Sequence, residues 1–298
     1  MLFLASFILK GQSQAALVAA SMAILGLVMP PAAWISAAVI VLVTLVSGPR
    51  SGLLTTALSL AGAAVFAFLI FAAPQVAIIF VLLAWLPAWV AASILRQTVS
   101  LAMSLQVLTG ISLFAVIATY AMFPDFGEFW REPLDEIVQQ LAEQSDDISL
   151  QELKQTEDWV IKFLPGLFAS SLMFGTMLSL LIGRWWQAVN FNPGGFAKEF
   201  QALNLGKLSA LITLIILLSA MFIGSIEMMS LAVVVFVLYG MQALSLLHAV
   251  INIRKINATW LFAFYMAMFF IPQLLILFIV VSLADPWINI RQRLMPAA

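Results

Sequence analysis

The sequence predicts an all-α membrane protein: a polytopic bundle of about nine transmembrane helices with one acidic two-helix loop outside the membrane. Of its 298 residues, 64% are hydrophobic and only 9% are charged, against about 25% charged in a typical soluble domain. A soluble fold of this size could not keep so much apolar surface away from water. The apolar runs are long and do not alternate in polarity, which favours helices over barrel strands.

The predicted spans follow from the apolar runs, since a helix needs about 20 residues to cross the hydrocarbon of a bilayer. The predicted segments are 13–29, 32–47, 53–72, 75–95, 98–122, 164–183, 208–224, 228–250 and 258–284. Pro30 and Pro31 separate the first two, which form either a tight helical hairpin or one broken segment. Pro272 could divide the last segment into a re-entrant pair, but each half is too short to cross, so nine spans are preferred.

The basic residues near the span ends predict the orientation. In the nine-span arrangement one side of the membrane, which we expect to be the cytoplasm together with the N-terminus, receives Lys10, Arg50, Arg96, Arg184, Lys198, Lys207, Arg254 and Lys255. The connections near residues 30, 73 and 226 contain no Lys or Arg. Arg291 and Arg293 disagree with this arrangement, because they follow the last span and fall on the other side.

Three regions are expected: a transmembrane bundle over 1–122, an extracytoplasmic loop over 123–163 and a second bundle over 164–298. The loop contains 11 of the 14 acidic residues. Its first helix is predicted from Pro133 in a first turn and from an apolar stripe at helical spacing, formed by Leu134, Ile137, Val138 and Leu141. A second helix begins at a capping box of Ser149 and Glu152 and runs towards Pro165. Asp146 and Asp147 fall in the turn between these helices.

The segment 184–207 is expected to lie at the cytoplasmic interface. Arg184, Trp185 and Trp186 read as an interface anchor, in which aromatic rings lie at headgroup depth beside a cation. A turn at 192–195 and a short helix over 196–205 follow.

The composition also limits the function classes. A net charge of −1 and the lack of a basic tract argue against nucleic-acid partners. The chain has no cysteine and a single histidine, His248, which excludes thiol catalysis and His- or Cys-rich metal centres. No catalytic constellation is visible, so we expect a protein that is not an enzyme and has no cofactor or metal. The expected partners are the lipid bilayer and either protein subunits or further copies of the chain.

One polar row is the candidate lining of a substrate or proton path. It lies in the span 228–250, has a spacing of three and consists of Tyr239, Gln242, Ser245 and His248. Polar groups at membrane depth are costly unless they face protein or water. Trp85 is a further candidate for the wall of such a cavity. Hydrogen bonding between packed helices is the alternative explanation of the row.

Two stripes of small residues, one residue in every four, are candidates for close helix packing or for a partner face. The span 164–183 has Ser171, Gly175, Ser179 and Gly183, and the first span has Ala15, Ala19 and Ala23. Packing within the chain and docking of a partner subunit both remain open.

Two sequence stretches carry a resemblance to a known family. Arg184-Trp185-Trp186-Gln187 with Asn192-Pro193-Gly194-Gly195-Phe196, and the stretch from Ala284 to Arg291, resemble the uncharacterised YybS-like family of bacterial membrane proteins. The resemblance implies a bacterial inner-membrane location. That family is distantly similar to the substrate-binding subunits of energy-coupling-factor transporters and to the rod-shape protein MreD. In such transporters, small residues like Ala15, Ala19 and Ala23 contact the partner subunit.

Two functional hypotheses follow from these patterns. The first is a small-molecule transporter or substrate-binding transporter subunit, with a cavity open to the outer face and lined by several of Tyr239, Gln242, Ser245 and Trp85. The second is a non-enzymatic scaffold of a cell-envelope assembly, which binds partners through residues 123–163.

Overall fold

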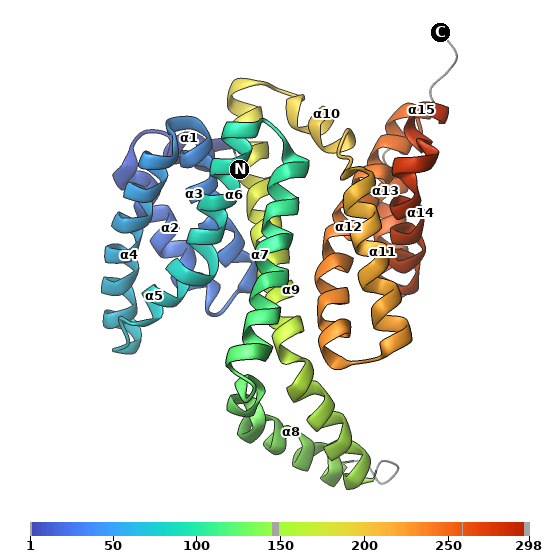
Figure 1. Ribbon diagram of the computed structural model, residues 1–298. Helices are drawn as coiled ribbons and strands as arrows, with labels where there is room; N and C mark the ends of the chain where they lie inside the picture. Colours follow the sequence, from blue (N-terminus) through green and yellow to red (C-terminus); the bar gives the residue numbers. More distant parts are fainter. Residues whose placement is uncertain (1, 145–148, 258, 295–298) are drawn as a thin grey trace.

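The computed structural model describes residues 2–144, 149–257 and 259–294, and every regular element in them is helical (Figure 1). Seven helices are long and apolar enough to cross a membrane, or eight if one bent pair counts as a single span. The polytopic all-α bundle is therefore confirmed. The expected Asp146–Asp147 turn lies outside the described residues. We call the end of the bundle that carries residues 126–163 the outer end, and the opposite end the inner end.

The first part of the chain folds as a bundle of antiparallel helices. These are α1 (Leu2–Ile8), α2 (Gln12–Gly26), α3 (Pro30–Ser47), α4 (Pro49–Phe71), α5 (Val76–Phe80), the π-helical turn η1 (Val81–Trp85) and α6 (Leu86–Thr98). Pro30 and Pro31 occupy the first turn of α3, where a missing N–H costs nothing. Of the two alternatives, the structure has the tight hairpin: a Cβ on Gly26 would lie 2.9 Å from the backbone N of Ala33.

The helix predicted for 13–29 is shorter than expected. With 15 residues, α2 is roughly 22 Å long, less than the hydrocarbon thickness of about 30 Å. Its apolar run extends to Met29, but the two prolines start the next helix and the residues before them form a turn. This helix and the bent pair near the C-terminus account for the difference from nine full spans.

The middle of the chain contains the longest helix. After α7 (Leu101–Met122), the 3₁₀ turn η2 (Phe126–Trp130) and α8 (Arg131–Gln144) form the outer headpiece, and α9 (Leu150–Phe191) then runs back through the whole bundle. The predicted capping box of Ser149 and Glu152 starts α9 and is confirmed. The break expected near Pro165 is absent, because one missing N–H is tolerated inside a buried helix.

The expected interface anchor needs a correction. The helix continues through Arg184 to Phe191, and Trp186 is 1% exposed inside the core, whereas Trp185 is 39% exposed. Of the two tryptophans, only Trp185 therefore has the exposed ring that an interface anchor requires. The short helix expected over 196–205 is α10 (Gly195–Gln201), and an irregular stretch leads from it to α11 (Gly206–Ile223).

The last part of the chain corrects the nine-span arrangement. After α12 (Ile226–Ile253), α13 (Thr259–Phe270) and α14 (Gln273–Ile288) are bent by 115° to one another at Pro272. The pair is thus a broken, re-entrant-type element rather than a straight span. The last helix of the described residues is α15 (Ile290–Leu294), where Arg291 donates to the carbonyl O of Leu203 at 2.9 Å. Arg291 therefore lies at the inner end, with the other basic span ends.

Candidate functional site

The structure places a pocket where α9 and α12 diverge. At their outer ends the two helices are in close contact: a Cβ on Gly166 would lie 2.5 Å from Cβ of Ser230. Tyr120 of α7 closes this end, because its hydroxyl donates to the carbonyl O of Lys162 at 2.8 Å and lies 2.7 Å from Oγ of Ser230. Towards the inner end the helices separate and leave a cavity of about 560 Å³.

The walls of this pocket are mainly apolar. Helix α9 contributes Leu178, Leu181, Ile182, Trp185, Ala188 and Val189, and the opposite wall consists of Met241, Leu244 and His248 of α12 and Tyr265 of α13. The conspicuous polar feature is a hydrogen bond of 2.7 Å between Nε2 of His248 and the hydroxyl of Tyr265. The ring of Phe200 meets the His248 ring edge-on, with centroids 5.7 Å apart. A volume of this size suits a small organic ligand.

The helix α10 lies against both α9 and α12 at the inner end of the bundle (Figure 1). Its residues Phe196, Ala197 and Phe200 line the pocket. On the α9 side, Arg184 and Glu199 form an ion pair of 2.7 Å. On the α12 side, Asn252 Nδ2 donates to Gln201 Oε1 at 2.9 Å, and Ser245 Oγ donates to the carbonyl O of Phe200 at 2.6 Å. We call residues 195–201 the strap. The strap is therefore bound to the helices on both sides of the pocket.

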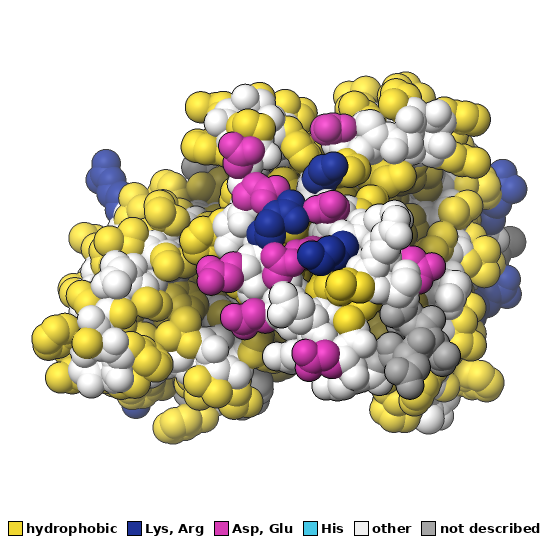
Figure 2. All heavy atoms as spheres, turned by 90° about the horizontal axis from the view of Figure 1, so that it is seen from below, with side chains coloured by type: hydrophobic (Ala, Val, Ile, Leu, Met, Phe, Trp, Pro, Cys, Tyr) yellow, Lys and Arg dark blue, Asp and Glu magenta, His cyan; other side chains and the backbone are white. Residues whose placement is uncertain are grey.

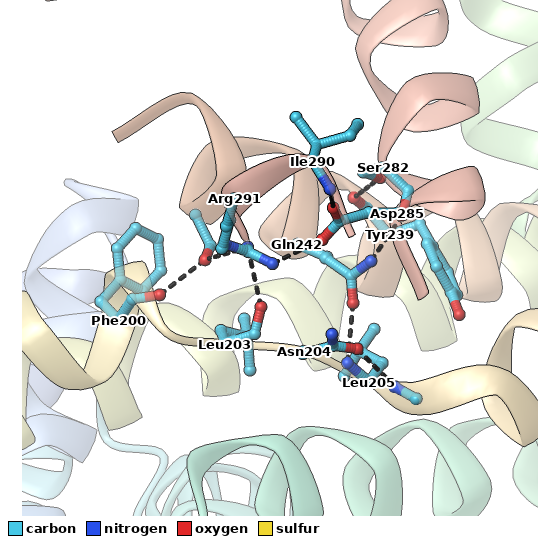
Figure 3. Close-up of polar contacts among 12 residues, drawn as sticks. Phe200, Leu203, Asn204, Leu205, Tyr239, Gln242, Ser282, Asp285, Ile290 and Arg291 are labelled. Carbon is cyan, nitrogen blue, oxygen red and sulfur yellow. Dashed lines mark hydrogen bonds and ion pairs between the residues drawn. The ribbon is translucent and has the colours of Figure 1, made fainter. Parts of the chain in front are cut away.

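The predicted polar row does not line one path. A helix turns about 100° per residue, so Tyr239 and His248, nine residues apart, lie on opposite sides of α12. His248 faces the pocket, whereas Tyr239, Gln242 and Ser245 are buried and contribute to none of the pockets described here. Gln242 instead bridges two elements: its Oε1 accepts from the N–H of Leu205 at 2.8 Å and its Nε2 donates to the carbonyl O of Ser282 at 2.6 Å (Figure 3).

A buried ion pair near Gln242 holds α15 against α14 (Figure 3). Asp285 is 1% exposed and accepts from Arg291 Nη1 at 2.5 Å and from the N–H of Ile290 at 2.9 Å. Arg291 also donates to Ser245 Oγ at 3.1 Å. The predicted span ended at residue 284, but α14 continues to Ile288, and the local sequence pattern does not indicate that Asp285 has a partner six residues later.

Trp85 belongs to a different part of the molecule. Its Nε1 donates to Ser36 Oγ at 2.9 Å, and Ser36 Oγ donates to the carbonyl O of Ala19 at 2.6 Å, so the three residues tie η1, α3 and α2 together. Trp85 is fully buried there. The structure therefore does not bring Trp85 together with the polar residues of α12.

The small-residue stripes lie mostly inside the molecule. On α9, a Cβ on Gly175 would meet Trp34 Nε1 at 2.9 Å and a Cβ on Gly183 would meet Val41 Cγ1 at 2.5 Å, so this stripe packs on α3. Ser179 is also buried, and only Ser171 is exposed. In α2, each member of the stripe has no exposed surface: Ala15, Ala19 and Ala23.

Sequence reasoning missed most of the pocket. The α9 wall from Leu178 to Val189 reads as ordinary apolar span, and its partner α13 was taken as part of a straight helix. One signal was present: Tyr265 is an isolated polar side chain in the apolar run of α13, at a depth where a polar atom needs a partner. His248 supplies that partner. Comparisons with family models, with curated proteins and with solved structures give no match, so the functional argument rests on this geometry.

Proposed function

We propose that this multi-pass membrane protein is a small-molecule transporter or the substrate-binding subunit of one, and that the pocket between α9 and α12 holds the substrate. The observation that carries the proposal is the cavity of about 560 Å³ with an apolar lining and one hydrogen-bonding pair, His248 and Tyr265. Ligand sites in proteins have this size and this balance of many apolar walls and few polar groups.

The position of the pocket supports transport. A second cavity, of about 370 Å³, lies at the outer end of the α9–α12 seam and is lined by Tyr120, Pro165 and Glu227 among others. The contact of Gly166 with Ser230 lies on the seam between the two cavities. A helix pair that is in contact near one membrane face and separated towards the other is the arrangement expected for one state of an alternating-access protein.

The distribution of basic residues supports the orientation. In our proposal the inner end, which carries Arg184, Lys198, Arg254 and Arg291, faces the cytoplasm, and residues 123–163 lie outside. The resemblance to the YybS-like family adds a bacterial inner membrane to this proposal.

The test is to fill the pocket. Leu244 lines it, so Leu244→Trp should exclude the ligand, whereas Leu214→Trp makes the same change at a partly exposed position of α11. Each protein is purified in mild detergent, and the small molecules that remain bound are quantified by native mass spectrometry. We expect a stoichiometric molecule in the wild type and in Leu214→Trp, and about a tenfold loss of it in Leu244→Trp. A wild type without a bound molecule, or equal amounts in both variants, would refute the proposal.

One observation favours a scaffold as the second candidate. The outer headpiece exposes Phe129 by 82% and Trp130 by 39% beside a surface that is rich in carboxylates (Figure 2). Exposed aromatic residues of this kind are frequent at protein interfaces. Because α9 continues through residue 163, deleting 123–163 would damage the bundle, so the test is Phe129→Ser with Glu143→Ser as the matched exposed control. Loss of co-purified proteins in Phe129→Ser alone would favour the scaffold, and unchanged partners would count against it.

A further inference from the structure

The pocket between α9 and α12 is obstructed towards the aqueous phase at the inner end. The strap covers that end and is fastened to α9 by the Arg184–Glu199 ion pair and to α12 by the Asn252–Gln201 hydrogen bond. Beyond the outer end of the pocket, α9 and α12 are in contact at Gly166 and Ser230. A ligand that moved along the axis of the bundle would have to break several of these contacts.

The side of the pocket is less firmly closed. Helix α13 forms this wall through Tyr265, and none of the residues of α13 is buried. Its packing partner is α14, where the ring centroids of Phe264 and Phe278 lie 4.4 Å apart, and the hydrogen bond between Tyr265 and His248 links it to α12. Tyr265 of α13 and Trp185 of α9, which both line the pocket, are each 39% exposed. The pocket is therefore least obstructed on the side of α13, which faces the lipid in the proposed arrangement.

The lining changes polarity with depth. His248 is five residues from the inner end of α12, which places it about 8 Å below that end, where headgroups meet acyl chains. Met241 lies about 10 Å deeper, and it lines the pocket together with the apolar side chains of Leu178 and Leu181. Hydrogen-bonding groups near the interface and apolar walls below them match a molecule that is polar at one end.

We propose that the pocket receives a membrane-resident amphiphile, a molecule with a long apolar chain and a hydrogen-bonding head, and that it enters sideways from the inner leaflet between α9 and α13. The chain lies between the apolar walls of α9 and α12, and the head lies at the His248–Tyr265 pair beneath the strap. This inference rests on the proposed function, because it names the substrate class of the same pocket.

Photo-crosslinking in nanodiscs tests this inference. The discs contain a small fraction of a phospholipid with a diazirine near the end of one acyl chain, and crosslinked peptides are mapped by mass spectrometry after illumination. We expect crosslinks on residues 178–189 and 241–248 in addition to the exposed residues of α11 between positions 211 and 222. Leu244→Trp should reduce the pocket crosslinks about tenfold and leave those on α11 unchanged, and Leu214→Trp should leave the pocket crosslinks unchanged.

A second measurement uses the absence of cysteine from the chain. Leu244→Cys introduces a single thiol into the pocket without adding bulk. We expect it to react with a maleimide that partitions into lipid and to resist a sulfonated, water-soluble maleimide. The exposed variant Glu143→Cys, which should react readily with the sulfonated reagent, shows that the reagent is active.

The outcomes separate this inference from the proposed function. If the lipid probe labels only α11 and the sulfonated reagent reaches the thiol in the pocket, while the bound molecule is still lost in Leu244→Trp, the pocket binds a water-soluble ligand and the inference is wrong. If neither probe reaches the pocket and no bound molecule is found, both proposals fail. Labelling of the pocket by the lipid probe, with loss in Leu244→Trp, supports both.

Discussion

At the scale of single residues, Gln242 shows why a polar side chain in a membrane helix is ambiguous in the sequence. A primary amide can line a water-filled path or join helices, and both uses satisfy the rule that polar groups at membrane depth need partners. In the structure, Gln242 is fully buried and uses both ends of its amide, on Leu205 and on Ser282. Those partners are 37 and 40 residues away in the chain, so only the fold could decide between the two uses.

Gln242→Leu should therefore affect stability rather than binding. The change leaves the buried N–H of Leu205 and the carbonyl of Ser282 without this partner, which should lower the free energy of unfolding by about 1–3 kcal/mol. The bound molecule should remain, because Gln242 does not line the pocket, whereas His248→Ala should weaken binding. Unfolding in detergent and native mass spectrometry measure the two effects, with exposed Gln139→Leu as the control. Loss of the bound molecule at unchanged stability would contradict the assignment.

The outer headpiece contains a pH-dependent contact. Arg131 donates to both carboxylate oxygens of Glu128, at 2.5 and 2.9 Å, and also to Asp158 of α9 at 2.9 Å. The hydrogen bond from Arg131 lowers the pKa of the Glu128 carboxyl below its ordinary value. A carboxyl with a lowered pKa stabilises the folded form above the pKa of the unfolded chain, and this contribution disappears as the pH falls through the lowered pKa.

The contact between η2 and α8 within the headpiece should accordingly loosen in acid. Fluorescence of Trp130 and Trp159, followed as the pH is lowered, should report a transition below the ordinary range of a glutamate carboxyl. In Glu128→Gln the transition should be absent, because the neutral amide does not titrate. An unaltered acid transition in that variant would assign the change to another carboxyl.

At the scale of helices, the sequence predicted correctly the helix ends that depend on local hydrogen bonds. It did not predict the helix ends that depend on packing against distant helices. Ser149 and Glu152 satisfy each other within one turn, so the start of α9 was predictable. Pro165 was not a stop, because it is buried beside Gly166, which packs on Ser230 of a distant helix. Pro272 has no buried neighbour on α13 and does end a helix. The same residue type has different effects because the surroundings differ.

The packing of α9 on α3 can be tested with two glycines. A Cβ on Gly183 would lie 2.5 Å from Val41 Cγ1 and 3.0 Å from the carbonyl O of Ala38, so Gly183→Ala should destabilise the protein by about 1–3 kcal/mol. Gly110 on α7 has no heavy atom within 4 Å of such a Cβ, so Gly110→Ala should be neutral or slightly stabilising through helix propensity. Thermal unfolding in the same detergent compares them, and equal effects would contradict the close packing.

At the scale of the whole molecule, the bend at Pro272 removes the one conflict in the predicted orientation. A straight last span puts Arg291 opposite the other basic residues, whereas the 115° bend brings it back to Leu203 and Ser245 at the inner end. The membrane class, most spans and the headpiece could be predicted from hydropathy and helix signals. The pocket could not, because it depends on the angle between α9 and α12.

The inner and outer ends of the bundle predict which single-cysteine variants are labelled from the same side of the membrane. Single cysteines placed by Lys10→Cys and Arg293→Cys should react from one side of sealed vesicles, and one placed by Glu143→Cys should react from the other. A membrane-impermeant maleimide applied to right-side-out and inverted vesicles measures this. If Arg293→Cys reacts from the side of Glu143→Cys, the last pair of helices crosses the membrane as one span.

The length of α9 has a mechanical consequence. Its 42 residues form a rod of roughly 63 Å that carries the headpiece at one end and a wall of the pocket at the other. The tight contact at Gly166 divides the rod into arms of roughly 24 and 38 Å. The N–H missing at Pro165 removes one hydrogen bond of the helix at this point, whereas Gly175 and Gly183 hold the longer arm on α3. A force that tilts the headpiece should therefore bend α9 at Pro165 and leave the pocket wall in place.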